Sequence, residues 1–245
     1  MDKSEILALR RAVLEKEFSR MNERQRQAVF SVNGPLLILA GAGSGKTTVL
    51  INRIANILRY GNAYNSTFIQ DALCAEDLAA CRAYLDGDAP LPEETRRHLS
   101  VSACLPWKIM AITFTNKAAG ELKDRLCAML GAEGNDIWAS TFHSTCARIL
   151  RRDGERIGYS SHFTIYDTDD QRRLMKNILK ELNVSEKSTP PKAVLNEISR
   201  AKDSLITPEE YEKTAGDDFR QKIIARAYKL YQQRLRDADA MDFDG

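Results

Sequence analysis

Residues 35–48 read PLLILAGAGSGKTT, and this stretch decides the fold. Its first part, Pro35 to Ala40, is wholly apolar and follows Asn33-Gly34. Such a run predicts a short strand that is buried on both faces of a parallel sheet. From Lys46 to Leu58, apolar residues recur with the period of a helix. A strand, a glycine-rich loop and a helix in this order predict an α/β unit.

The middle of the stretch, Ala40 to Thr47, matches the phosphate-binding loop GxxxxGK[ST], with Ala40 in place of the first glycine. Glycines let consecutive backbone N–H groups converge on phosphates, and the helix that starts near Lys46 adds the positive end of its dipole. We expect the catalytic Lys46 ammonium to stabilise charge on the β and γ phosphates, and the Thr47 hydroxyl to ligate Mg²⁺. The sequence therefore predicts a site for ATP with Mg²⁺. Its loop residues are Ala40, Gly41, Ala42, Gly43, Ser44, Gly45, Lys46, Thr47 and Thr48.

Other classes of phosphate-loop protein share parts of this pattern. Guanine-specific GTPases carry an NKxD motif that Asn116-Lys117 resembles, but Ala119 stands where the guanine-binding Asp is needed. Small-molecule kinases combine a phosphate loop with a helical lid that carries arginines, and Arg172-Arg173 could serve there. A P-loop small-molecule kinase stays open as an alternative, as does a nucleotide-regulated DNA-binding module without motor activity.

Two further segments each follow a predicted strand. Thr113 to Ala119 comes after the apolar run 108–113, and Ser140 to Ser144 comes after the strand-like residues 136–139. In a parallel sheet both segments lie at the carboxyl edge beside the phosphate loop, where ligands bind. Each offers hydroxyls, one aromatic ring and a donor for phosphate, which is the composition of a track for single-stranded nucleic acid. Packing in the core is the alternative role for the two rings, Phe114 and Phe142.

Several stretches stand in the order in which the UvrD/PcrA/Rep family of superfamily 1 DNA helicases carries them, and the chain resembles that family. They are MNERQRQAV at 21–29, the loop at 40–48, ITFTNKAA at 112–119 and TFHS at 141–144, the last followed by CARIL at 146–150. The likeness continues through FTIYD at 163–167, LITPEEY at 205–211 and MDFD at 241–244. It covers most of the chain outside residues 1–18 and 62–104.

The resemblance implies an enzyme, an ATP-dependent DNA helicase that moves 3′ to 5′ on single-stranded DNA and unwinds duplexes at junctions, in DNA repair or replication. It implies that Gln25 binds the adenine edge and that Arg53, on the helix after the loop, lies close to the nucleotide. For His143 a capping or structural role is the alternative to DNA binding. The expected DNA-binding residues are Phe114, Thr115, Asn116, Lys117, Thr141, Phe142 and His143.

The same resemblance divides the chain into domains. Residues 1–152 are expected to form the first RecA-like motor domain, an α/β fold with an incomplete parallel sheet and an insertion at about 62–104 that holds one or two short helices. Residues 153–238 are expected to form an all-helical subdomain inserted in the motor domain, and residues 239–245 return toward it.

The chain stops at Gly245, where the family continues into the Walker B strand with its Mg²⁺-binding Asp and catalytic Glu. We therefore expect an N-terminal fragment whose partner is the C-terminal remainder of the same helicase. Alone, this fragment is expected to be a monomer that turns over ATP slowly or not at all.

Composition identifies no partner, because 36 Lys and Arg nearly balance 34 Asp and Glu. Any nucleic-acid surface must then be a local patch. The five cysteines form no CxxC pair and are odd in number, which indicates neither a zinc site nor a disulfide framework. The sequence has no apolar signal region and no transmembrane run of about 18 apolar residues, and so predicts a cytoplasmic protein.

Overall fold

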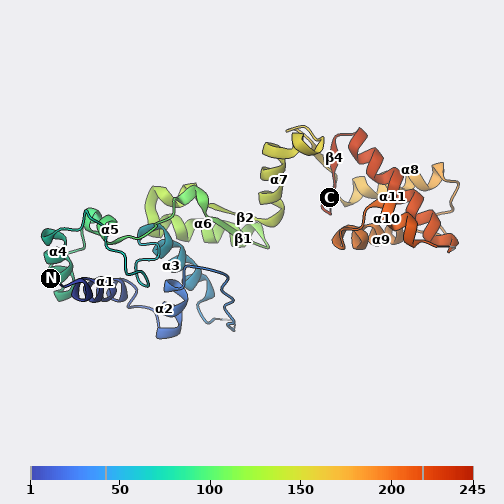
Figure 1. Cartoon of the computed structure of the whole chain (residues 1–245). Helices are drawn as coiled ribbons and strands as arrows, with labels where there is room; N and C mark the ends of the chain where they lie inside the picture. Colours follow the sequence, from blue (N-terminus) through green and yellow to red (C-terminus); the bar gives the residue numbers. More distant parts are fainter. Residues whose placement is uncertain (1, 42, 217, 245) are drawn as a thin grey trace. The chain divides into compact units, whose positions relative to one another are not determined.

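The structure is a computed structural model that describes residues 2–41, 43–216 and 218–244. The chain divides into two compact units, the first ending at Phe142 and the second beginning at His143. The elements of the first unit are α1 (Lys3–Glu17), α2 (Glu23–Phe30), α3 (Lys46–Arg59), α4 (Ala75–Asp86), α5 (Glu93–Leu99), η1 (Pro106–Lys108), β1 (Met110–Thr113), α6 (Asn116–Leu130), η2 (Gly131–Asp136) and β2 (Trp138–Thr141) (Figure 1).

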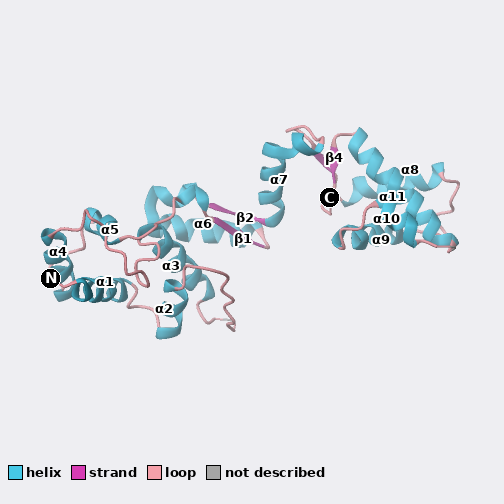
Figure 2. Ribbon diagram, viewed as in Figure 1, coloured by secondary structure: helices cyan, strands magenta, loops and turns pink. Residues whose placement is uncertain are grey.

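The strands predicted at residues 108–113 and 136–139 correspond to β1 and β2, each of which begins two residues later than predicted. They pair in parallel, with Met110 opposite Trp138 and Thr113 opposite Thr141 (Figure 2). Helices α3 and α6 supply most of the apolar side chains of this core, and burying each Leu or Ile contributes about 1.5–3 kcal/mol. The buried residues are Ile51, Ile54, Ala55, Leu58, Ala111, Leu122, Leu126, Leu130 and Ile137.

The predicted buried strand at residues 35–40 is wrong for this structure. These residues form no strand, and the side chains of Leu37 and Leu39 are 81% and 86% exposed. A strand of a parallel sheet needs hydrogen-bonding neighbours beside it and helices over both faces. Among the described residues, β1 pairs only with β2 in this unit's sheet, so the apolar run has nothing against which to be buried.

The predicted insertion contains two helices, α4 and α5, and its two ends meet. Gly61 and Val101 form a parallel bridge. The Asn62 N–H donates to the Val101 carbonyl (2.8 Å), and the Val101 N–H donates to the Tyr60 carbonyl (2.9 Å). Gly61 has a φ of +59°, and a Cβ there would lie 2.2 Å from the Val101 oxygen, so only glycine fits. The segment therefore leaves the end of α3 and returns to the same place.

Helix α1 packs against this insertion. A small apolar cluster joins them, made of Val13, Cys81, Leu91 and Leu99. Polar bonds support it, since the buried Arg10 guanidinium donates to the carbonyls of Ser66 and Phe68. The N-terminal helix and the insertion thus form one accessory layer.

Glu17, at the end of α1, ties this layer to α3. Its carboxylate accepts a hydrogen bond from the Tyr60 hydroxyl (2.6 Å) and pairs with Arg59 at 3.2 Å. Arg96 of α5 lies 3.6 Å from the same carboxylate. One buried anion thereby joins α1, α5 and the end of α3.

The second unit is mainly helical. Its elements are α7 (Phe142–Asp153), which begins at the last residue of the first unit, η3 (Gly154–Ile157), β3 (Thr164–Ile165), α8 (Thr168–Glu181), α9 (Pro191–Asp203), α10 (Pro208–Thr214), α11 (Phe219–Asp237) and β4 (Ala240–Met241). Strands β3 and β4 pair in parallel, with Thr164 opposite Ala240. The core lies between α8, α9 and α11, and its fully buried members include Met175, Leu179 and Tyr231.

No helix in the described part of the chain is long and apolar enough to span a membrane. All five cysteines are free thiols.

Candidate functional site

The phosphate loop ends where α3 begins. Gly45 is the residue before the helix and has a φ of +81°, and Gly43 has a φ of +74°. L-residues with a side chain rarely adopt this left-handed region, which explains the two glycines. Ala42, also expected in the loop, lies outside the described residues. The N–H groups at the start of α3 therefore point out of an exposed glycine turn, as an anion site requires.

Polar side chains of the loop bond to its own backbone. The Lys46 ammonium donates to the carbonyls of Ala40 (2.9 Å) and Gly41 (2.7 Å), and the Ser44 hydroxyl donates to Gly41 (2.7 Å). Lys46, Thr47 and Thr48 are all exposed. The ammonium and the two threonine hydroxyls are therefore accessible to a ligand at the mouth of the loop.

Gln25 lies against this loop. Its Oε1 accepts from the Asn22 N–H (3.0 Å), which caps α2, and its Nε2 donates to the Ser44 carbonyl (3.2 Å). A Cβ on Gly45 would lie 3.1 Å from the same Nε2, so the amide fits closely over the glycine. Gln25, placed near the nucleotide by resemblance, is thus brought to the phosphate loop by the cap of α2.

Arg53 bonds to the end of α2, whereas Gln25 bonds to the phosphate loop. Its Nη1 donates to the carbonyls of Ala28 (2.6 Å) and Ser31, at the carboxyl end of α2. Asn56 Nδ2 donates to the Val29 carbonyl (3.1 Å) nearby. These side chains satisfy carbonyls that a helix end leaves without partners, and they hold α2 on α3. The structure therefore shows Arg53 supporting the helix that carries Gln25.

The two aromatic residues after β1 and β2 lie together. Phe114 is 92% exposed and Phe142 is 53% exposed, and their ring centroids are 6.2 Å apart at an angle of 42°. The parallel pairing of β1 with β2 brings both rings to one edge, because Thr113 stands opposite Thr141. Packing in the core is therefore excluded for Phe114, and the pair forms an exposed aromatic platform.

The start of α6 lies beside this platform. The Thr115 hydroxyl accepts from the Ala118 N–H (3.2 Å) and caps the helix, and Asn116 and Lys117 are exposed in its first turn. A helix start and a cationic side chain are both suited to phosphate. The structure thus gathers three of the expected DNA-binding side chains next to Phe114.

Thr141 and His143 are the two remaining expected DNA-binding residues. Thr141 is 8% exposed within β2, so its side chain lies largely inside the fold. His143 belongs to the second unit, where its ring packs edge-on against Phe243 at 5.2 Å. The contact with Phe243 gives His143 a structural role within that unit.

Asp167 and Asp242 lie in the family-like stretches 163–167 and 241–244, and both carboxylates form structural bonds. Asp167 caps α8 by accepting from the N–H groups of Asp169 and Asp170, and these bonds hold its pKa below the ordinary value. Asp242 is 6% exposed and pairs with Lys202 at 2.7 Å. No group of three or more His, Cys, Asp or Glu side chains that could hold a metal ion occurs in the described residues.

The network around Asp242 was not foreseen from the sequence. The Tyr231 hydroxyl donates to its Oδ2 (2.9 Å), and Lys202 reaches both carboxylate oxygens. Burial and the neighbouring Asp242 raise the pKa of Tyr231, so its hydroxyl stays a donor. Lys202 lies on α9, Tyr231 lies on α11 and Asp242 follows β4, so only the packing of these elements brings the three side chains together. No local sequence pattern indicates this contact.

Comparison with known proteins places this geometry in a family. The model of the UvrD/REP helicase N-terminal domain matches residues 21–70 and 91–245. The chain is 41% identical over 226 residues to an ATP-dependent DNA helicase PcrA of Bacillus subtilis, covering 92% of this chain and 25% of that protein. It is 40% identical over 225 residues to the PcrA helicase of Leuconostoc citreum, covering 91% and 24%. The chain spans about a quarter of the length of these relatives.

Proposed function

The chain belongs to the UvrD/REP helicase family, and on that premise we propose that its parent is an ATP-dependent DNA helicase to which this chain contributes the ATP-binding part. The bond between Gln25 and the Ser44 carbonyl is the observation that carries the proposal. It sets an amide beside the phosphate loop, where one side chain can bind a base while the loop binds the phosphates of the same nucleotide.

Different residues of the loop bind different parts of ATP and its Mg²⁺. The N–H groups of residues 41–48 and the start of α3 cradle the phosphates. With ATP bound, the Lys46 ammonium would exchange its carbonyl partners for the β and γ phosphates, and the Thr47 hydroxyl would hold Mg²⁺, which would neutralise phosphate charge. Arg53 acts indirectly by holding α2, and therefore Gln25, in place.

Single-stranded DNA is the proposed substrate of the aromatic platform. Phe114 and Phe142 stack on bases, while Thr115, Asn116 and Lys117 at the start of α6 bind the backbone. Stacking serves a translocating motor because every base offers a face to a ring. Thr141 supports the platform from within β2, and His143 contacts DNA from its place beside Phe243.

The proposed domain plan follows the family. Residues 1–152 form the RecA-like motor domain with an accessory insertion at about 62–104, residues 153–238 form the inserted helical subdomain, and residues 239–245 return toward the motor domain. The mainly helical second unit supports the helical subdomain of this plan. The parent moves 3′ to 5′, acts at duplex junctions and works in the cytoplasm.

Equilibrium binding of a fluorescent ATP analogue with Mg²⁺ tests the nucleotide part of the proposal. Lys46→Ala removes the ammonium and is expected to weaken binding about tenfold or more, since bonds to charged groups contribute about 1.5–3 kcal/mol. The matched control is Lys213→Ala, an exposed lysine on α10. Equal weakening by both variants, or by neither, contradicts a phosphate site at this loop.

A further inference from the structure

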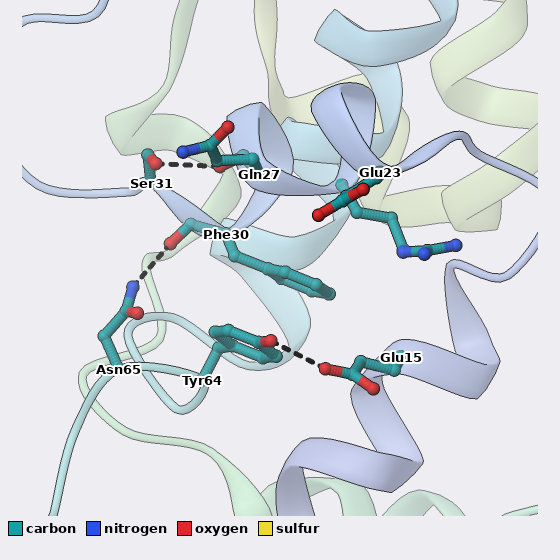
Figure 3. Close-up of a pocket in the computed structure, with 8 residues that line it drawn as sticks. Glu15, Glu23, Gln27, Phe30, Ser31, Tyr64 and Asn65 are labelled. Carbon is teal, nitrogen blue, oxygen red and sulfur yellow. Dashed lines mark hydrogen bonds between the residues drawn. The ribbon is translucent and has the colours of Figure 1, made fainter.

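A pocket of about 540 Å³ lies beside α2 (Figure 3). Glu23, Arg26, Gln27 and Phe30 line it and share one helical face, because they are spaced three and four residues apart. Gln25 lies on the opposite face of the same helix, where it bonds to Ser44. The pocket is therefore separate from the proposed nucleotide site.

Three elements fix the walls of this pocket. The Tyr64 ring stacks on Phe30 with centroids 4.0 Å apart and an angle of 6°. Its hydroxyl donates to Glu15 Oε1 of α1 (2.7 Å), and Asn65 Nδ2 donates to the Phe30 carbonyl (2.8 Å). Figure 3 shows the Tyr64–Glu15 and Asn65–Phe30 bonds as dashed lines. The loop at 64–65 is thus fixed to α1 and α2, and the pocket is formed without a ligand.

Acceptors dominate the polar lining. Among the described residues Glu23 forms no ion pair or hydrogen bond, and Glu15 uses Oε1 alone, for Tyr64. The amide of Asn65 donates through Nδ2 and leaves its Oδ1 as an acceptor. Arg26 is the one cationic side chain of the lining, and its Nη1 donates to the Met21 carbonyl (2.8 Å). The pocket therefore offers two carboxylates and an aromatic ring to a donor-rich group.

We propose that this pocket binds a guanidinium or ammonium group between Glu15 and Glu23, with the stem of that group against the Tyr64 ring. Carboxylates supply charge-assisted hydrogen bonds, and an aromatic ring attracts a cation placed close to it. The ligand is either a basic side chain of a partner protein or a small polyamine, since both present this chemistry.

Of the eight lining residues, Glu15 alone lies outside the part of the chain that the family model matches. Glu15 belongs to α1, and the match to the family model begins only at residue 21. The wall that Glu15 supplies comes from the accessory layer of α1 and the insertion. A pocket that draws on this layer can recognise a ligand without being part of the common helicase machinery.

Isothermal titration of the 245-residue chain, without nucleotide or DNA, tests the proposal. The probes are agmatine, spermidine and N-acetyl-arginine amide, at physiological ionic strength. We expect saturable binding that Glu23→Gln weakens about threefold to tenfold, as loss of one partly exposed ion pair would. The Glu23 side chain forms no hydrogen bond or ion pair in the described fold, so the change to Gln is expected to leave the fold intact.

The matched control is Glu94→Gln, an exposed glutamate on α5 that does not line the pocket. It is expected to leave binding unchanged. If spermidine binds more tightly than N-acetyl-arginine amide, the ligand of this pocket is a small polyamine. If the arginine amide binds more tightly, the ligand is a basic side chain of a partner protein. The absence of saturable binding, or equal weakening by Glu23→Gln and Glu94→Gln, overturns the proposal. Neither result bears on ATP or DNA binding, so failure here is distinct from failure of the proposed function.

Discussion

Gln25 Nε2 donates to the main-chain carbonyl of Ser44 at 3.2 Å, so the cap of α2 and the phosphate loop share one side chain. Because the amide Oε1 is held by the Asn22 N–H at 3.0 Å, its orientation is fixed before any base arrives. A fixed donor and acceptor pair can distinguish adenine from guanine.

Gln25→Ala is therefore expected to reduce ATP affinity about tenfold and to abolish the preference for ATP over GTP, because loss of one or two hydrogen bonds costs about 1–2 kcal/mol. Competition against a fluorescent nucleotide measures both quantities. Gln27→Ala is the matched control, because Gln27 lies on the other face of α2. An unchanged ratio of ATP to GTP affinity in Gln25→Ala would exclude Gln25 from base recognition.

Phe114→Ala is expected to weaken binding of single-stranded oligonucleotides about tenfold, since stacking of one base on an aromatic ring contributes about 1–3 kcal/mol. Stability should not change, because the ring is 92% exposed. Fluorescence anisotropy with labelled oligothymidine gives the affinity. Phe219→Ala removes a ring that is 79% exposed on α11 and serves as the control. If the two variants bind DNA equally well, the aromatic platform is not the DNA site.

Asp77 should make the accessory layer sensitive to acid. Burial acts to raise the pKa of Asp77, but hydrogen bonds from the Cys74 N–H, His98 and Thr95 outweigh it and hold the pKa at about 2. Because the folded pKa is below the ordinary 3.8, the stabilisation is complete above about pH 4 and is lost as the pH falls toward 2.

Urea unfolding measured at about pH 5 and pH 3 should then show a loss of about 1 kcal/mol that the Asp77→Asn variant does not show. The comparison between wild type and variant removes the contribution of other carboxylates. A variant with the same pH dependence as wild type would show that Asp77 titrates normally in the folded protein.

The Lys202–Asp242 pair should stabilise the second unit. Asp242→Asn leaves the Lys202 ammonium buried without its counter-ion and is expected to lower the free energy of unfolding by about 3–5 kcal/mol. Arg200→Gln removes an ion pair with Glu197 in which the arginine side chain is 75% exposed, and should cost less than about 1 kcal/mol. Denaturation followed by circular dichroism compares them. Similar losses in the two variants would contradict the burial of the first pair.

Much of the local structure could be predicted from the sequence. The phosphate loop, the helix that follows it and the positions of β1 and β2 depend on short patterns, and each is present. The meeting of Phe114 with Phe142 followed from the rule that parallel strands end at one edge.

Features that depend on distant parts of the chain could not be predicted. Residues 35–40 have the composition of a buried strand, yet burial requires neighbours that no local pattern specifies. The stacking of Tyr64 on Phe30 and the pairing of Thr164 with Ala240 could not be predicted for the same reason. The sequence around each residue does not indicate its distant partner.

If this chain is the nucleotide site of a motor driven by DNA, ATP hydrolysis by the full-length parent must depend on DNA and on Lys46. The rate is measured with and without single-stranded DNA for wild type, Lys46→Ala and Phe114→Ala. We expect DNA to increase the rate of ATP hydrolysis by wild type strongly, and Lys46→Ala to show no hydrolysis. Phe114→Ala should need a higher DNA concentration for half-maximal stimulation of its rate. A wild-type rate that DNA does not change, or that survives in Lys46→Ala, would contradict this account.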